Sequence, residues 1–358
     1  MKKVLKGIGI VVAVIVVVVA VFIAVLTITE YKPEAEENAE IYSSGQAKEK
    51  IYKGSNLTIM SWNIGFAAQG ADTDCFLDGG TMVIQTDEEG VNANLSAISE
   101  TISSYNPDMM LLQEVDKDSK RSHNIDQYAY LQGEFAGYSN SFALNYSTLY
   151  VPYPFPTTYG KVNAGLATFT KVTPESSTRI SLPCSFSWPM STVNLKRCLL
   201  VDRIKIEGTE KELVIVNLHL EAYDDGEGKA AQTKQLCELL QSEYDKGNYV
   251  IAAGDFNQTF SNCDTSAYPT IDVPWQPPVV DVTEFGDDFT LMMDNSVPTC
   301  RSLDKVYTGA DHDASAFQYY MIDGIIASDN ITVNELKTID TDFAYSDHNP
   351  IIMSITLD

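Results

Sequence analysis

The stretch Tyr249-Val-Ile-Ala-Ala-Gly-Asp-Phe-Asn-Gln-Thr-Phe260 begins as an apolar run that is typical of a buried strand, and it ends in a polar cluster. Side chains alternate between the two faces of an extended chain, so Asp255 and Asn257 share one face while Phe256 lies on the other. An acid and an amide at the end of a rigid strand can form a polar site. The same residues also suit a strand followed by an Asx turn, and the rest of the chain has to decide between the two.

The same arrangement, an apolar segment that leads to a polar side chain, recurs along the chain. The predicted strands of this kind cover residues 57–63, 108–114, 212–219, 249–257, 317–326 and 351–357. The polar residues within or next to them are Asn63, Glu114, His219, Asp255, Asn257, Asp323, Asp347 and His348. So many polar strand ends in one chain indicate a single site where the strand ends converge.

The chemical character of this set points to a metal-assisted reaction. It contains carboxylates, amides and two histidines, but no cysteine. Oxygen ligands favour a hard cation, Mg²⁺ or Mn²⁺ with Ca²⁺ as an alternative, which is held by one or two carboxylates and a substrate phosphate. Imidazoles beside carboxylates suit general acid–base work and contact with phosphate.

The remaining pattern predicts one large mixed domain. Further predicted elements are helices over 91–105 and 229–244 and strands over 164–169, 198–206 and 331–337. Residues 66–90 and 258–315 are predicted to be long loops, and the aromatic-rich segment from Ser122 to Tyr159 is predicted to be irregular. Many strands with few helices between them indicate an α/β domain built on mixed or antiparallel sheets.

The first 30 residues predict a cytoplasmic, lysine-rich start and a transmembrane helix. Residues 7–29 are uncharged, and at about 1.5 Å per residue a helix of this length spans a hydrocarbon core of about 30 Å. Lysines precede the run and glutamates follow it, so the positive-inside rule places everything after residue 30 outside the cell. A cleaved signal peptide is the alternative. Residues 31–55 are predicted to be an acidic juxtamembrane stalk, and residues 56–358 the globular domain.

Charge and cysteine content limit the classes of partner. The formal net charge is −25, so a polyanion such as DNA would be repelled at long range, although a local basic groove or metal-bound phosphate is compatible with this charge. The six cysteines fit no zinc-binding spacing. An external location would permit disulfides without identifying the pairs. No protein partner can be inferred from the sequence.

Six short motifs carry a resemblance to a known family. They are Ser61-Trp62-Asn63, Leu112-Gln113-Glu114-Val115-Asp116, Asn217-Leu218-His219-Leu220, Gly254-Asp255-Phe256-Asn257, Ile322-Asp323-Gly324-Ile325 and Ser346-Asp347-His348-Asn349-Pro350. In this order they resemble the motifs of the endonuclease/exonuclease/phosphatase superfamily, which includes deoxyribonucleases, abasic-site endonucleases, neutral sphingomyelinases and inositol polyphosphate 5-phosphatases. The resemblance covers residues 57–357. It implies a four-layer αββα sandwich of two packed mixed β-sheets flanked by helices, with the site at one end.

The resemblance also implies roles for the metal-binding and water-activating residues. Glu114 is expected to be the main metal ligand with Asn63 beside it, and Asp347 is expected to bind a second metal or tune the site. Asp255 is expected to activate or orient the attacking water, and Asn257 to position that water or contact the phosphate.

The histidines complete the implied site. His348 is expected to stabilise charge on the phosphoryl group in the transition state, and Asp323 to hold His348 in the right tautomer. His219 is expected to contact the phosphate or to act as a general acid. Gly324 departs from the pattern, because many members carry an aromatic residue there, and its small size either widens the site or has little effect.

Residues outside the motifs are weaker candidates for contact with the substrate. Arg197 is one, although it also suits a solvated basic pair, and Arg121 and Tyr159 are others. The remaining histidines, His123 and His312, are predicted to be surface loop residues.

Together these patterns predict a membrane-anchored, extracellular phosphodiesterase that depends on a divalent metal. A phospholipid head group would suit the membrane tether and the aromatic segment from Tyr146 to Tyr159. A secreted or surface endonuclease acting on DNA or RNA is the alternative. A binding module that kept the fold but lost activity is a further one, against which the filled motif positions argue. A purely structural ectodomain would leave the polar strand ends unexplained.

Overall fold

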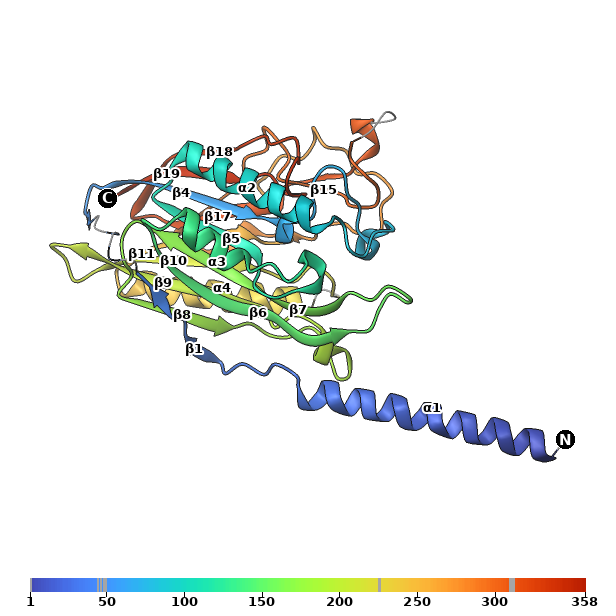
Figure 1. The fold of residues 1–358 in the computed structure, drawn as a ribbon. Helices are drawn as coiled ribbons and strands as arrows, with labels where there is room; N and C mark the ends of the chain where they lie inside the picture. The colour runs from blue at the N-terminus through green and yellow to red at the C-terminus, as the bar shows by residue number, and fades with distance from the viewer. Residues whose placement is uncertain (1, 44, 46, 48–49, 225–226, 309–312) are drawn as a thin grey trace.

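Two packed β-sheets form the centre of the molecule, and helices cover their outer faces (Figure 1). The computed structural model describes the chain except for residues 1, 44, 46, 48–49, 225–226 and 309–312, so the prediction for His312 lies outside the described residues. The first sheet has the order β1 (Glu36–Asn38), β8 (Ser176–Ser181), β9 (Cys198–Glu207), β10 (Glu212–His219), β11 (Tyr249–Asp255), β17 (Asp323–Ser328) and β14 (Phe289–Met292), and β3 (Ile51–Tyr52) also pairs with β9. The second has the order β18 (Ile331–Thr338), β19 (Ile351–Leu357), β4 (Asn56–Asn63), β5 (Met109–Asp116), β7 (Gly160–Thr170), β6 (Ser139–Val151) and β2 (Ile41–Tyr42).

The alternation of apolar side chains along the strands produces the layers. Alternate residues of both sheets, such as Ile59 of β4 and Ile251 of β11, pack between the sheets. The opposite face of the second sheet packs against α2 (Glu88–Tyr105) and α3 (Gln127–Glu134). The opposite face of the first sheet packs against α4 (Glu227–Asp245). This is the predicted αββα sandwich. Two short ladders lie outside the sheets, β12 (Thr259–Phe260) with β13 (Val279–Val280) and β15 (Cys300–Arg301) with β16 (Tyr319–Tyr320).

The strand pairing brings polar residues together at one end of the sandwich. Strands β10 and β11 are parallel and place His219 beside Asp255, and the antiparallel β17 starts with Asp323 on the other side of Asp255. Gly254 allows this close approach, because its φ is +154° and a Cβ atom there would lie 2.0 Å from the carbonyl oxygen of Leu218. Any larger residue at this position would push β11 away from β10.

Three regions differ from the sequence-based expectation. Residues 258–315 were expected to be a long loop, but they contain β14 at the edge of the first sheet and the short strands β12, β13 and β15. The segment from Ser122 to Tyr159 is largely regular, because it contains α3 and the long strand β6. Residues 31–55 were expected to form a stalk, but they supply β1, β2 and β3, which pair with β8, β6 and β9 at the edges of both sheets. This segment is therefore laid along the domain and is not a free spacer.

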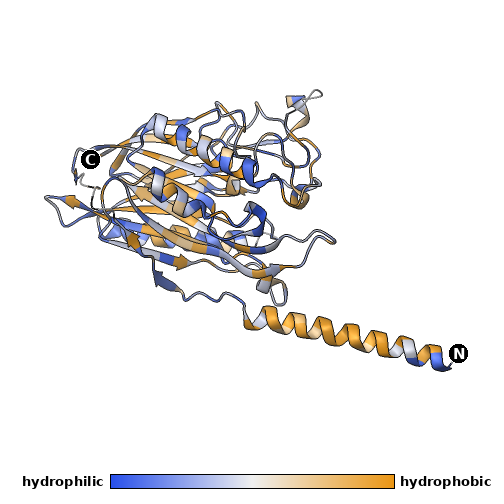
Figure 2. Ribbon diagram, in the orientation of Figure 1, coloured by the Kyte–Doolittle hydropathy of each residue, from blue (hydrophilic) through white to orange (hydrophobic). Residues whose placement is uncertain are grey.

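The N-terminal helix α1 (Lys2–Ile28) projects from the domain and is long and apolar enough to cross a membrane (Figures 1 and 2). Its carboxyl end is attached to the domain. Leu26 is buried in an apolar cluster with Tyr146 and Tyr159, and the indole Nε1 of Trp188 donates a hydrogen bond to Thr27 Oγ1 at 3.0 Å. Just after the helix, Lys196 Nζ lies 2.8 Å from a carboxylate oxygen of Glu30. The domain thus holds the end of the helix through packing, a hydrogen bond and an ion pair.

A buried acid between the sheets should make stability depend on pH. Asp202 on β9 is fully buried, and the hydroxyl of Ser141 on β6 donates to its carboxylate. Burial raises the pKa of Asp202 from 3.8 to about 6, so the folded state binds a proton more tightly than the unfolded state. Stability should fall by about 3 kcal/mol as the pH rises through this interval.

Asp202→Asn is expected to remove this component. The free energy of unfolding of the variant, relative to that of the wild type, should rise between pH 4 and pH 7 when both are measured by urea unfolding in detergent micelles. Other acids contribute equally to both proteins and cancel in the difference. A difference that stays constant with pH would contradict the assignment.

Candidate active site

The predicted polar residues line one pocket of 110 Å³ at the end of the sandwich. Those on its wall are Asn63, Glu114, Arg197, His219, Asp255, Asn257, Asp347 and His348. Asp323 lies behind His348 and touches its ring. The polar strand-end residues that were expected to converge therefore lie together at one end of the sandwich.

Asn63 and Asp255 join the two sheets at the floor of the pocket. Asn63 Nδ2 donates to Asp255 Oδ2 at 3.0 Å and lies 3.2 Å from Glu114 Oε1. The backbone N–H of Asn257 donates to Asp255 Oδ1 at 2.8 Å, so the Asx turn also forms, while Oδ2 faces the pocket residues. Burial raises the pKa of Asp255 to about 7. The 249–260 stretch therefore forms the Asx turn and also places Asp255 and Asn257 at the pocket.

Glu114 reaches the pocket through a β-bulge. The pairing of β5 with β7 shifts register between Leu112 and Val115, and Glu114 has a φ of +56°. Strict alternation would place Glu114 on the same face as Leu112, which packs in the core under α2. The bulge re-aims its carboxylate, as bulges next to active sites do.

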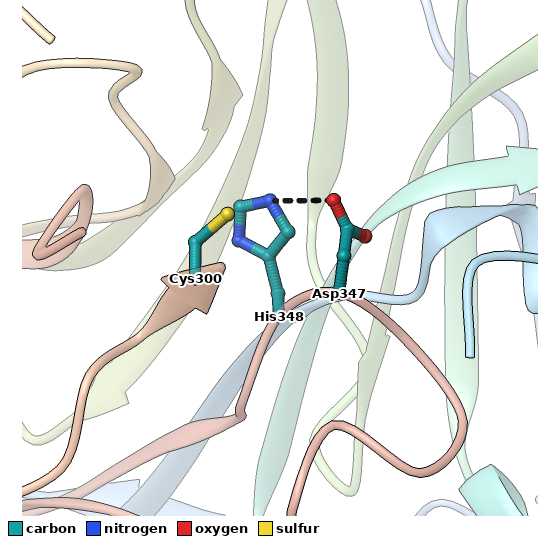
Figure 3. Close-up of side chains that lie close together, drawn as sticks. All are labelled: Cys300, Asp347 and His348. Carbon is teal, nitrogen blue, oxygen red and sulfur yellow. Dashed lines mark ion pairs between the residues drawn. The ribbon is translucent and has the colours of Figure 1, made fainter. Parts of the chain in front are cut away.

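His348 is held by Asp323 and surrounded by acids. Its Nδ1 lies 2.8 Å from Asp323 Oδ2, and its Nε2 lies 3.7 Å from Asp255 Oδ2 and 3.9 Å from Asp347 Oδ2. Figure 3 shows the His348 ring between the carboxylate of Asp347 and the thiol of Cys300. Burial lowers the pKa of His348, but Asp323 and the other acids outweigh this effect and raise the pKa well above its ordinary value. His348 is therefore protonated at neutral pH.

His219 is in the opposite state. Its Nε2 lies 3.3 Å from Asp255 Oδ2, and its buried Nδ1 has no hydrogen-bond partner among the described residues. Burial, and then the positive charges of Arg197 and His348, hold the pKa of His219 well below its ordinary value. The pocket thus contains one charged and one neutral imidazole on either side of Asp255.

The donor set around Glu114 and Asp347 fits a hard cation. The pKa of Asp347 is raised to about 6; burial is the main cause and the carboxylates of Glu114 and Asp78 add to it, whereas His348 and Arg301 oppose the rise. A group of facing carboxylates is what Mg²⁺, Mn²⁺ or Ca²⁺ binds, and a bound cation would relieve their mutual repulsion.

Two histidine-containing clusters fit a cation less well. Asp255, Asp323 and His348 lie close together, but Asp323 already occupies one imidazole nitrogen of His348. In the cluster of Cys300, Asp347 and His348, burial raises the pKa of the Cys300 thiol to about 12. This thiol therefore stays protonated at neutral pH, and metal ligation requires a thiolate.

The weaker candidates divide into two groups. Arg197 is buried at the pocket wall, and its Nε and Nη1 have no hydrogen-bond partner among the described residues. Its nearest acid, Glu221, lies 3.7 Å away. Arg121 instead binds Asp116 through Nε at 3.1 Å and Nη2 at 2.9 Å, and its Nη1 donates to Tyr159 at 2.9 Å. Arg197 is therefore available to an anion, whereas the Arg121 guanidinium is already engaged.

Some pocket residues had no signal in the sequence. Asp78, Tyr223, Trp275 and Cys300 line the pocket from stretches that were predicted to be loops or carried no pattern, and Tyr223 Oη donates to Asp78 Oδ1 at 2.5 Å. Apolar periodicity says nothing about such segments, so only a structure could place these residues.

Gly324 and His123, which the sequence analysis singled out, do not contribute to the pocket. A Cβ atom at Gly324 would meet Met293 and Phe260, on the face of β17 opposite Asp323, so the small residue does not widen the pocket. His123 is half-buried in its loop, with Nε2 2.8 Å from the carbonyl oxygen of Thr86.

Comparison with known proteins decides the family. The profile of the Endonuclease/Exonuclease/phosphatase family matches residues 60–348, most of the chain. The chain belongs to this family. It is therefore a metal-dependent phosphoester hydrolase by class. No curated protein sequence matches it.

Solved structures of the endonuclease/exonuclease/phosphatase fold resemble the whole domain. The protein of this family from Beutenbergia cavernae is 20% identical with a TM-score of 0.56, and the match covers 84% of this chain and 72% of that one. The family member from Bacteroides vulgatus is 15% identical with a TM-score of 0.52, covering 85% and 100%. The human nocturnin catalytic domain, solved with a bound sulfate anion, is 17% identical with a TM-score of 0.51, covering 89% and 97%. At these identities the likeness concerns the fold.

Proposed function

We propose that this chain is a membrane-anchored phosphodiesterase that uses a divalent cation, Mg²⁺ first among the candidates, and acts outside the cell. The observation that carries the proposal is the position of Asp255 Oδ2, 3.3 Å from His219 Nε2 and 3.7 Å from His348 Nε2, with the pKa of His219 lowered by burial and that of His348 raised by the surrounding acids. A carboxylate with a pKa of about 7 between two such groups is suited to proton transfer at neutral pH.

The substrate phosphate would bind between the carboxylate cluster and Arg197. Glu114 and Asp347, with Asn63 beside Glu114, would hold the cation. When bound, the cation supplies positive charge that polarises the phosphoryl group. Arg197 offers its unpartnered N–H groups to a phosphate oxygen, which would resolve their missing hydrogen bonds.

The reaction then needs one proton to be removed and one to be supplied. Asp255 accepts a proton from water, whose oxygen forms the new P–O bond while the bond to the leaving alkoxide breaks. His348, charged and oriented by Asp323, hydrogen-bonds to the phosphoryl oxygens or transfers its proton to the leaving oxygen; in the first case the leaving alkoxide takes its proton from water. Asn257 positions the water. His219 is neutral, so it is suited to holding Asp255 through a hydrogen bond and not to protonating the leaving group.

Retention of α1 is part of the proposal, in preference to cleavage as a signal peptide. Leu26 and Thr27 contact the folded domain, and cleavage after the apolar run would remove both contacts. Lysines at positions 2, 3 and 6 place the amino end in the cytoplasm by the positive-inside rule. The intact mass of the protein extracted from membranes tests retention, because cleavage would remove the mass of the helix.

Activity should be tested with the full chain in detergent. Soluble bis(4-nitrophenyl) phosphate, sphingomyelin, phosphoinositides and plasmid DNA would be offered with Mg²⁺, Mn²⁺ or Ca²⁺ and then with EDTA. We expect metal-dependent hydrolysis that EDTA abolishes, and a drop in kcat of about 10²–10³-fold in His348→Ala, the loss typical of a transition-state donor. Hydrolysis of plasmid DNA alone would favour an endonuclease. A folded protein that hydrolyses none of these with any metal would refute the proposal.

A further inference from the structure

Exposed apolar side chains form a rim beside the active-site end of the domain. The rim consists of Leu149 and Tyr150 at the end of β6, Phe155 in the β6–β7 connection, and Trp188 and Met190 in the segment before β9. Phe155 is 89% exposed and Trp188 is 60% exposed. Large aromatic residues held in water in such a group mark a surface that contacts an apolar partner.

This rim lies along α1. The rings of Phe22 and Tyr150 meet edge to face with centroids 6.2 Å apart, and Trp188 is hydrogen-bonded to Thr27. Phe22 precedes the end of α1 by six residues, so the rim runs about 9 Å along the apolar length of the helix. Figure 1 shows α1 and the β6–β7 connection projecting from the same end of the domain, and Figure 2 shows that α1 is apolar along most of its length.

A second cavity of 280 Å³ connects the rim with the active-site pocket. Its wall is largely apolar and includes Phe76, Tyr146 and Val151, together with Met190 of the rim. Glu114, Arg197 and His219 line both this cavity and the catalytic pocket. An apolar wall of this kind suits an apolar group better than water.

We propose that the rim docks on the bilayer that α1 crosses, so that the active site receives the phosphodiester of a membrane lipid. The phosphate would lie at Arg197 and the carboxylate cluster, and part of the lipid's apolar portion would occupy the second cavity. This inference rests on the phosphodiesterase function proposed above and names its substrate class.

The charge of the chain indicates which bilayer the rim fits. With a formal net charge of −25, the protein is repelled by an anionic lipid surface. The rim itself is apolar and aromatic, and aromatic side chains are favoured at the level of the head groups. Docking is therefore driven by burial of apolar area, and a zwitterionic bilayer is the better partner.

Docking can be measured with the full chain in phosphatidylcholine liposomes. Brominated acyl chains quench nearby tryptophans, and Trp188 is exposed whereas Trp62 is buried. We expect quenching in the wild type that is largely lost in Trp188→Phe. Unquenched Trp188 fluorescence in liposomes that contain the inserted protein would overturn the docking proposal.

Comparing hydrolysis of a bilayer lipid with hydrolysis of a soluble substrate separates docking from catalysis. The pair Leu149→Ser and Phe155→Ser should lower hydrolysis of a lipid phosphodiester in the bilayer by about ten-fold or more, since each buried side chain of this size contributes about that factor. Hydrolysis of soluble bis(4-nitrophenyl) phosphate should be unchanged. Tyr52→Ser, an exposed residue on β3 at the far end of the sheet, is the matched control and should affect neither substrate.

The outcomes distinguish failure of the phosphodiesterase function from failure of the proposed lipid substrate. If neither substrate is hydrolysed, the phosphodiesterase function fails, whatever the quenching shows. If the soluble substrate is hydrolysed and Trp188 is quenched, but no bilayer lipid is hydrolysed, the lipid substrate is refuted. If the rim variants lose a protein partner or self-association while lipid turnover stays normal, the rim binds protein and the proposal is wrong.

Discussion

Asp255→Asn is expected to lower kcat by about 10⁴-fold, the upper range for loss of a general base, with little loss of stability. Asparagine has the same shape, but it cannot accept the proton of the attacking water. It also presents an N–H group where Asn63 and His219 now meet a carboxylate oxygen. These clashing N–H groups cost stability. Part of that cost is offset because the variant no longer buries a carboxylate, a burial that raises the pKa of Asp255 to about 7.

The control for this variant is the same chemical change elsewhere in the sandwich. Asp202 is also a fully buried acid with a raised pKa, but it contacts Ser141 and not the pocket. Asp202→Asn should therefore keep its kcat, measured with bis(4-nitrophenyl) phosphate and Mg²⁺, whereas Asp255→Asn should not. Thermal unfolding of both variants shows whether each is folded. If Asp255→Asn keeps its kcat within ten-fold of the wild type, the water is activated by another group.

The contrast between Asp255 and Glu114 shows how much of the site a sequence can predict. On β11, strict alternation runs from Tyr249 through Ile251 to Asp255, so the inner face of the strand leads directly to the site. Glu114 lies on the wrong face by the same rule and reaches the pocket only through the bulge after Leu112. The motif predicts that Glu114 is functional, but periodicity cannot predict its direction.

Apolar periodicity also fails to predict β6. Its buried residues include Ser139, Ser141 and Asn145, so the inner face does not appear apolar in the sequence. The polar character is needed inside, because Ser141 binds the buried carboxylate of Asp202 across the sheets. Periodicity detects strands only when the interior is apolar, and the short edge strands of residues 31–55 lack that signal as well.

Glu114→Gln is expected to weaken metal binding by more than the 10–100-fold that removal of a supporting partner costs, because a metal ligand itself is altered. The variant keeps an oxygen for Asn63 Nδ2 but loses the negative charge that faces Asp347. At a Mg²⁺ concentration of about 100 times Kd, the cation stabilises the wild type by about 2.7 kcal/mol. Most of the resulting rise in Tm should disappear in the variant.

Activity should follow the loss of metal. At a Mg²⁺ concentration that saturates the wild type, kcat/KM of Glu114→Gln should fall by about 10³-fold, since the charge on the phosphoryl group is no longer neutralised. Raising Mg²⁺ should restore part of this loss, which a damaged fold would not allow. Glu335→Gln, the same change at an exposed position of β18, should behave as the wild type. An unchanged Mg²⁺-dependent rise in Tm in Glu114→Gln would mean that the cation binds elsewhere, because a site that uses the Glu114 carboxylate must lose affinity when that charge is removed.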